Sequence, residues 1–393
     1  MLYKNLSRNV WLLSVSHAFS FAGASVTFFL GGIIGALLAP SITMATLPVA
    51  ASVIGTAMGT WPAAMFMSKK GRKVGFIGAA VFAAASALLG ATAIWQSHFW
   101  LYCFSCLSLG LSYAFVQHYR FAAAESVAIE IAPQAISAIL LSGIAGAFLG
   151  PNIVNYAHNW IPQHAFAGSY LALAVLVLIP AIILLWMQAP PLQSTTKDYT
   201  TGRTIRQLAQ QPNFILAVLA ATLSYALMVF LMTATPLSMH VMNGHSMDDT
   251  SIVIQWHIVG MFLPSLFVGK WITKYGHRKI MLLGILAIAI CIGVSQVNQS
   301  VTGYWISLVS LGLGWNFLFV SSTSLLITTY KEAEKFRAQG FNELMVFGVQ
   351  AIASLSAGWL LSMSDWKSIN LMSIPFLVLL LLVIWWSNKK SVA

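Results

Sequence analysis

The sequence predicts an all-α integral membrane protein whose twelve transmembrane helices form two pseudo-symmetric six-helix halves. Composition, the placement of the basic residues and an internal repeat lead to this prediction. The chain has 393 residues, of which 59% are hydrophobic and only 7% are charged. Soluble domains are about 25% charged, so the composition excludes a water-soluble globule.

Twelve apolar stretches are long enough to cross the hydrocarbon core, which takes about 20 helical residues. They cover residues 10–36, 45–67, 74–95, 99–120, 134–157, 165–187, 213–236, 250–272, 279–297, 302–326, 342–363 and 367–387. The first is too long for the apolar region of a secretory signal and lacks an evident cleavage site, so we expect it to be retained as a helix. An even number of crossings puts both termini on one side of the membrane.

Lys and Arg residues gather between successive pairs of apolar stretches, and Lys367 alone breaks the pattern. The others are Lys4, Arg8, Lys69, Lys70, Arg72, Lys73, Arg120, Lys197, Arg203, Arg206, Lys270, Lys274, Arg278, Lys279, Lys331, Lys335, Arg337, Lys389 and Lys390. Short loops rich in Lys and Arg stay in the cytoplasm, so we expect cytoplasmic termini in a bacterial inner membrane. Because the basic residues form no continuous stripe, the net charge of +11 indicates topology, and we expect no nucleic-acid partner.

Cys103 and Cys106 form a C-x-x-C sequence inside an apolar stretch. No second pair of zinc ligands accompanies them. We therefore expect these cysteines to pack in the core, and we expect neither a metal nor a cofactor.

The longest polar stretch runs from Gln188 to Pro212 and divides the chain. We predict an N-terminal six-helix half at 1–188, a cytoplasmic linker at 189–212 and a C-terminal six-helix half at 213–393. The end of the linker, at 204–209, is predicted to form a short amphipathic helix on the membrane surface.

The two halves are similar to each other at a constant offset of 205 residues. The offset relates Gly55 to Gly260, Lys69 to Lys274, Gly71 to Gly276, Lys73 to Arg278, Gln134 to Gln339 and Gly143 to Gly348. Six matches at one offset indicate a duplication, and two halves oriented alike in the membrane are one of the known plans of transporters.

Two loops related by this offset resemble the G-x-x-x-D-[RK]-x-G-R-[RK] motif of the major facilitator superfamily. The first reads Ala64-Met-Phe-Met-Ser68-Lys69-Lys70-Gly71-Arg72-Lys73, and the second reads Gly269-Lys-Trp-Ile-Thr273-Lys274-Tyr-Gly276-His277-Arg278. The resemblance, which covers the whole chain, implies that these residues form a cytoplasmic gate. In the family the Asp holds this gate through charged contacts; here Ser68 and Thr273 replace it, so we expect gating through hydrogen bonds. The gate candidates are Ser68, Lys69, Gly71, Arg72, Thr273, Lys274, Gly276, Arg278 and Glu343.

Further strings carry the resemblance but do not identify a cargo. Residues 146–151 resemble the family's G-x-x-x-G-P antiporter motif, although the two glycines that usually follow are Val154 and Asn155. Residues 119–125, 254–262 and 339–343 look like a bacterial subgroup of the superfamily whose members are mostly classed as generic transporters. The resemblance implies fold and mechanism, and leaves import or export open.

The transport site is expected at mid-membrane, where polar groups in the spans are the first candidates. No carboxylate is predicted there, since Glu343 is placed within about one turn of a helix end. Histidine is the substitute because its charge switches near neutral pH. His17 and His257 are therefore the candidates for substrate contact and for carrying a coupled proton, with interhelical packing as the alternative for each.

Other candidates lie near the middle or the cytoplasmic end of the spans. Arg120, at the cytoplasmic end of the fourth span, could meet an anionic substrate, pair with Glu125 or Glu343, reach the lipid headgroups or serve the gate. The neutral candidates for substrate binding are Tyr113, Tyr225, Gln255, Trp256, Trp315 and Asn316, with core packing as the alternative.

These observations predict a monomeric secondary transporter surrounded by membrane lipid, with a small organic molecule as its substrate and a proton as the candidate coupling ion. A neutral or anionic metabolite, vitamin or siderophore-like acid is favoured. A multidrug/proton antiporter is the alternative, and a non-transporting membrane sensor is a remote one. The absence of an H-E-x-x-H or G-x-S-x-G string argues against a membrane-embedded enzyme.

Overall fold

The computed structural model describes residues 6–41, 44, 47–162, 164, 166–188 and 202–392, and these residues contain helices and no strand. The first group of helices comprises α1 (Arg8–Leu38), α2 (Leu47–Lys70), α3 (Arg72–Trp95), α4 (Phe99–Val116), α5 (Tyr119–Glu125), α6 (Ala132–Ala157) and α7 (Ala167–Ile183). The second comprises α8 (Ile205–Leu208), α9 (Pro212–Pro236), α10 (Met247–Phe262), α11 (Val268–Tyr275), α12 (His277–Val297), α13 (Val301–Leu326), α14 (Lys335–Met363), α15 (Trp366–Leu371) and α16 (Ile374–Val392).

Most of these helices are long and apolar enough to cross a membrane. Within the described residues ten helical spans meet that criterion alone, and α10 with α11 forms an eleventh that is bent by 50°. The 29-residue helix α14 is also long enough to cross. The all-α membrane fold is therefore confirmed, and the helices agree with the twelve predicted segments.

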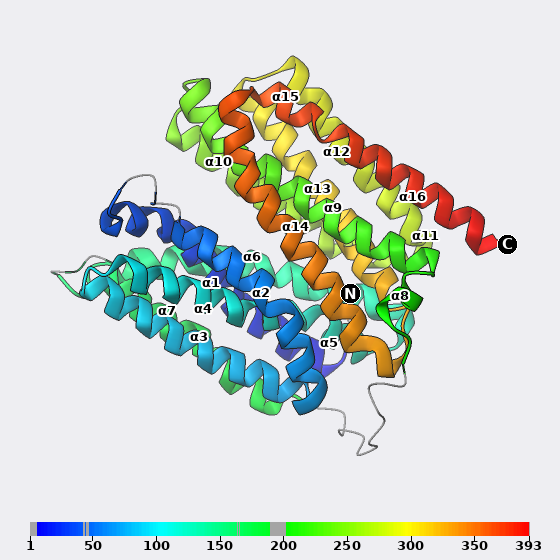
Figure 1. Cartoon of the computed structure of the whole chain (residues 1–393), viewed down its shortest axis with the longest axis horizontal. Coiled ribbons are helices and arrows are strands. Elements are labelled where there is room, and N and C mark those ends of the chain that lie inside the picture. The colour runs from blue at the N-terminus through cyan, green and yellow to red at the C-terminus, as the bar shows by residue number, and fades with distance from the viewer. Residues whose placement is uncertain are drawn as a thin grey trace.

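The helices lie in two groups on either side of a central seam (Figure 1). In the first group α1 packs on α6, α2 on α4 and α3 on α7, while in the second group α13 packs on α9, α10 and α12. The seam is formed where α14 lies against α2 and where α11 lies against α6. The half boundaries stay a prediction, and linker residues 189–201 lie outside the described residues.

The linker's last turn is ordered by its own side chains. Thr204 accepts a hydrogen bond from the Gln207 backbone while the Gln207 side chain accepts one from the Thr204 backbone, so α8 begins with a capping box. The predicted short helix is present, and its Leu208 is buried in the second group.

Backbone geometry repeats at the predicted offset of 205 residues. Gly71 joins α2 to α3 with φ 83° and ψ 158°, and Gly276 joins α11 to α12 with φ 85° and ψ 157°. Side chains with a Cβ atom rarely adopt this conformation. Lys73 and Arg278, which follow at matching positions, donate hydrogen bonds to the carbonyls of Leu185 and Ser387 near the ends of the sixth and twelfth crossings.

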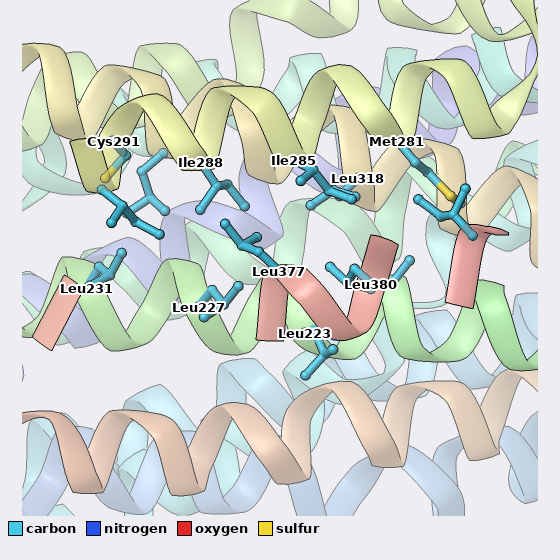
Figure 2. Packing of buried hydrophobic residues seen from close by; sticks show 14 of the residues in the cluster. Leu223, Leu227, Leu231, Met281, Ile285, Ile288, Cys291, Leu318, Leu377 and Leu380 are labelled. Carbon is cyan, nitrogen blue, oxygen red and sulfur yellow. The ribbon is translucent and has the colours of Figure 1, made fainter. Parts of the chain in front are cut away.

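The hydrophobic effect does not drive helices together in lipid, so their association depends on close packing, which small residues permit. A Cβ atom on Gly55 of α2 would lie 2.1 Å from the carbonyl oxygen of Leu107 on α4, and one on Gly110 of α4 would lie 2.0 Å from that of Ser52. Elsewhere larger side chains interdigitate. Figure 2 shows Leu227 of α9, Leu377 of α16 and Ile288 of α12 in one such cluster.

Candidate functional site: an aromatic cluster and two charged contacts across the seam

Aromatic side chains from both groups meet at the seam. Phe21 of α1 contacts Phe262 of α10 edge-to-face, with centroids 5.4 Å apart, and Phe262 contacts Trp315 of α13 at 6.0 Å. Trp315 stacks on Phe319 at 5.0 Å, one turn further along α13. We call Phe21, Tyr225, Phe262, Trp315, Phe319 and Phe347 the aromatic cluster.

Tyr225 of α9, one of the candidates for substrate binding, lies at the centre of this cluster. Its ring makes edge-on or tilted contacts with Trp315 at 5.3 Å, Phe319 at 5.0 Å and Phe347 at 5.4 Å. Trp315 is 1% exposed, and its indole Nε1 has no hydrogen-bond partner among the described residues. A buried N–H donor without a partner is costly, so the cluster offers one hydrogen bond to an incoming acceptor.

His17 and Tyr113 border the same cluster on the side of the first group. Phe21 lies 5.8 Å from the His17 ring and 6.4 Å from the Tyr113 ring. His17 Nδ1 lies 3.0 Å from Ser142 Oγ. Because the Ser142 hydroxyl already donates to the Ile139 carbonyl, His17 is the donor in this contact, which joins α1 to α6.

Arg120 forms a buried ion pair across the seam. Its Nη2 lies 2.5 Å from Glu343 Oε1 of α14, and both side chains are almost fully buried. Its Nη1 donates to Gln117, and Asn342 donates to the same Glu343 oxygen. Arg120 Nε and Glu343 Oε2 have no partner within the described residues.

The placement of Glu343 close to a helix end was wrong. The eleventh crossing begins at Lys335, eight residues before Glu343, which puts the carboxylate about 12 Å along the helix at 1.5 Å per residue. Lys335 and Arg337 lower the hydropathy of the first turns of the helix, so the predicted apolar segment started too late. A carboxylate therefore does lie inside the bundle.

The Arg120 guanidinium also links the ion pair to the aromatic cluster. It lies 4.5 Å from the ring centroid of Phe319 and 4.8 Å from that of Phe121. Phe319 thus contacts the cation and, through stacking, Trp315. Cation–π contacts strengthen where water is excluded, so these rings compensate part of the desolvation of Arg120.

A second charged contact closes the end of the bundle that carries Lys69, Lys73, Lys274 and Lys335, which we call the basic end. Arg72 donates to Glu125 from Nε at 3.0 Å and from Nη2 at 2.5 Å, and its Nη2 also donates to the Gln339 side chain of α14 at 2.8 Å. Gln339 donates in turn to Glu125 and to the Tyr330 hydroxyl. Lys335 lies 3.5 Å from Glu125.

This contact adds charged groups to the hydrogen bonds expected among the gate candidates. Ser68 hydrogen-bonds the carbonyl of Met65 in its own helix and is buried, so it does not replace the acid of the motif. Glu125, at the end of α5, supplies the negative charge instead. Charged contacts across the seam therefore persist, with the acid taken from another helix.

The second copy of the motif contacts the first group through Thr273, which donates to the carbonyl of Glu130 at 3.2 Å. Its Arg278 donates to Asn213 of the second group at 2.8 Å. Lys274 lies over the neighbouring Tyr275 ring at 5.1 Å, and Lys69 of the first copy is exposed.

Asn316 and His257 lie between helices of the second group. Asn316 donates to the Met261 carbonyl at 2.6 Å and to Ser265 Oγ at 2.7 Å, at the point where α10 breaks before Pro264. Proline cannot donate a backbone hydrogen bond, and Asn316 braces the backbone beside it. His257 donates from Nδ1 to the Leu308 carbonyl at 2.7 Å, and its Nε2 has no partner among the described residues.

Gln255 and Trp256 are not part of the aromatic cluster. Trp256 is 48% exposed and contacts Trp305 at 5.8 Å, and Gln255 is exposed beside it. Phe21, Phe262, Phe319 and Phe347 are the members that the sequence did not reveal, because a phenylalanine in an apolar stretch looks like any core residue. No group of three His, Cys, Asp or Glu side chains placed to hold a metal occurs in the described residues.

Comparison with known proteins identifies the family. The model of the Major Facilitator Superfamily matches residues 217–392. The chain is 37% identical to the riboflavin transporter RfnT of Brucella anthropi over 375 residues, which cover 95% of this chain and 94% of that protein. It is 25% identical to the uncharacterized MFS-type transporter YdeG of Bacillus subtilis, covering 99% and 93% of the two chains.

Solved structures share the fold at low sequence identity. The Escherichia coli fucose:proton symporter superposes with a TM-score of 0.75 at 15% identity, covering 96% of this chain and 98% of that one. A bacterial homologue of ferroportin in an outward-facing state gives 0.71 at 16% identity, covering 98% and 100%. Fold and sequence together show that the chain belongs to the major facilitator superfamily and is a multi-pass membrane transporter, not an enzyme.

Proposed function

We propose that this protein transports riboflavin, or a solute with a similar planar ring system, by alternating access. The observation that carries the proposal is the 37% identity to a riboflavin transporter along 95% of the chain. It narrows the broader expectation of a neutral or anionic metabolite or vitamin. The arrangement of side chains at the seam supports it in three ways.

First, the aromatic cluster suits a flat, uncharged ring system. Aromatic side chains in offset or edge-on contact contribute about 0.5–1.5 kcal/mol beyond their buried area. Trp315 and Tyr225 present such surfaces at the seam, where the two groups meet. A planar ligand could enter between Phe21 and Phe262, the pair that joins the groups.

Second, polar groups lie next to the rings, and one of them, the indole N–H of Trp315, has no partner among the described residues. The indole N–H of Trp315 could donate to a ring carbonyl of the ligand, and His17 and Tyr113 border the other side. A neutral vitamin needs no counter-charge, so the pairing of Arg120 with Glu343 does not conflict with its binding.

Third, the charged contacts at the basic end give alternating access a physical basis. For the substrate to leave toward that end, Arg72 must separate from Gln339 and Arg120 from Glu343. We assign this end to the cytoplasm, following the distribution of Lys and Arg. The structure then represents a state closed toward the cytoplasm.

Proton coupling belongs to the same proposal as a separate step. His17, His257 and Glu343 are buried groups able to accept a proton. His17→Ala and His257→Ala test the histidine hypothesis. In at least one of these variants, an imposed pH gradient should no longer accelerate transport. Unchanged acceleration in both would remove the histidines and leave Glu343.

The multidrug antiporter alternative loses part of its basis. A Cβ atom on Gly146 would lie 2.5 Å from the Ala18 carbonyl oxygen, and one on Gly150 would lie 2.9 Å from that of Ala22. The G-x-x-x-G spacing thus serves the packing of α6 on α1. Close helix approach accounts for these glycines without an antiport mechanism.

The test uses cells that cannot make riboflavin and two tryptophan variants. Uptake by cells producing the natural chain should saturate, and Trp315→Leu should raise the half-saturating concentration about tenfold if it removes about 1.4 kcal/mol of stacking and hydrogen bonding. Trp256→Leu is the matched control and should behave like the natural chain. Equal effects of the two variants would refute the aromatic cluster as the site.

A further inference from the structure

Two grooves on the outer surface of the second group meet at one lysine. The first, of about 640 Å³, lies between α12 and α16, and the second, of about 560 Å³, lies along α11 and α12. Both are lined by Tyr275, Lys279 and Leu282. We call Lys279 and the two grooves the forked site.

The walls of both grooves are mainly apolar and aromatic. Leu381, Ile384 and Trp385 of α16 line the first, and Trp271, Ile280 and Leu283 line the second. Figure 1 places α16 on the outer edge of the second group, away from α1–α7. In a membrane protein this surface faces acyl chains, and aromatic side chains mark the level of the headgroups.

The charged groups of the forked site are positive and lie at the basic end. Lys279 is exposed and has no hydrogen-bond or ion-pair partner among the described residues, whereas the neighbouring Arg278 is engaged by Asn213 and Ser387. Lys389 lies 4.0 Å from the Trp385 ring at the mouth of the first groove. No Asp or Glu lines either groove in the part of the chain that the structure describes.

The internal repeat shows that neither the motif nor the topology requires Lys279. The position 205 residues earlier is Val74, which is 54% exposed and uncharged. Position 278 has a basic counterpart at Lys73, so the loop keeps its positive charge without Lys279. Lys279 is therefore an additional cation where the two apolar grooves meet.

We propose that the forked site binds one anionic phospholipid, with the phosphate at Lys279 and one acyl chain in each groove. Basic pockets between transmembrane helices on the cytoplasmic side hold anionic headgroups. A forked groove with a single cation at its branch point matches a molecule with two chains and one charged head. The lipid would hold α16 against α12, at a distance from the aromatic cluster.

The experiment compares lipid binding by purified full-length protein, using native mass spectrometry with dioleoyl phosphatidylglycerol and dioleoyl phosphatidylcholine. The natural chain should bind phosphatidylglycerol more tightly than phosphatidylcholine. Lys279→Gln should weaken the binding of phosphatidylglycerol about fivefold, which is the effect of one charge near an anionic headgroup. The variant should leave the binding of phosphatidylcholine unchanged. Lys70→Gln, which removes an exposed lysine at the same end, should bind like the natural chain.

Three results of the lipid-binding comparison would each overturn the forked site. The first is equal binding of phosphatidylglycerol and phosphatidylcholine by the natural chain. The second is binding of phosphatidylglycerol by Lys279→Gln that equals binding by the natural chain. The third is a loss of phosphatidylglycerol binding in Lys70→Gln as large as the loss in Lys279→Gln. Inorganic phosphate, which lacks acyl chains, should not displace the bound lipid, and displacement would also contradict the proposal. Since Lys279 is exposed, the Gln variant should unfold at the temperature of the natural chain.

Discussion

Arg120 and Glu343 lie opposite each other in the seam, where neither side chain has access to water. Removing an ion from water is expensive, and the pair is tolerable only while each charge faces the other. Gln117, Asn342 and the rings of Phe121 and Phe319 surround it. The pair therefore opposes separation of the two groups at this point more strongly than an exposed salt bridge would.

Single and double substitutions at this pair should give unequal losses. Glu343→Gln leaves a buried cation without its partner and should lower the free energy of unfolding by about 3–5 kcal/mol. Arg120→Gln should act similarly. The double variant should lose less than the sum of the two, by about 0.5–3 kcal/mol, as measured by unfolding in detergent. Strict additivity would show that the two side chains do not interact.

Glu334 gives the stability a dependence on acid pH. A hydrogen bond from the Arg203 guanidinium lowers the pKa of Glu334 to about 2, whereas an unfolded Glu has a pKa of about 4.3. Because the folded pKa is the lower one, the stabilisation is complete above about pH 4.3 and is lost as the pH falls toward 2. Stability of the natural chain should fall more steeply in this range than that of Glu334→Gln. Identical pH profiles would contradict the assignment.

At the scale of helices, the two glycine junctions set the geometry of the duplicated motif. Gly71 and Gly276 adopt backbone angles that are nearly restricted to glycine. Gly71→Ala and Gly276→Ala should each cost about 1–3 kcal/mol of stability. Gly78 lies inside α3 with open space around the position of a Cβ atom. Gly78→Ala should leave the stability of the protein unchanged or raise it by up to about 1 kcal/mol. A similar loss at all three glycines would argue against backbone strain.

Most helices could be predicted because the bilayer sets one simple requirement, a long apolar run. This criterion misses the parts of a helix that carry charged residues. For this reason α14 begins seven residues before its predicted start. The bend between α10 and α11 was also not predicted. Pro264 is visible in the sequence, but the support that Asn316 gives to the bend depends on contact between distant segments.

At the scale of the whole molecule, the Arg72, Glu125 and Gln339 contact ties the two groups at the basic end. Glu125→Gln should loosen it, because Arg72 and Lys335 then lose their shared carboxylate. Spin labels at Lys69→Cys and Lys331→Cys, two exposed positions, should report longer distances in this background. Glu130→Gln is the control, since Thr273 contacts only the backbone carbonyl of Glu130. Unchanged distances in Glu125→Gln would show that the contact does not hold this end closed.

The candidate site was harder to predict than the fold, because it depends on which way each side chain points. Tyr225, Trp315 and Tyr113 lie in or beside the aromatic cluster, whereas Trp256 is half exposed on another face of its helix. All four are aromatic residues in spans, and no sequence pattern separates them. Glu125 was noted only as a possible partner of Arg120, and its pairing with Arg72 became visible only in three dimensions.

Counterflow of riboflavin tests the central claim most directly. Purified protein in liposomes preloaded with unlabelled riboflavin should take up labelled riboflavin in a saturable manner, faster than into liposomes without internal riboflavin. This exchange needs neither a known direction nor a known coupling ion, because both halves of the cycle carry substrate. Uptake no greater than that of protein-free liposomes, by protein that is folded and inserted, would contradict the account.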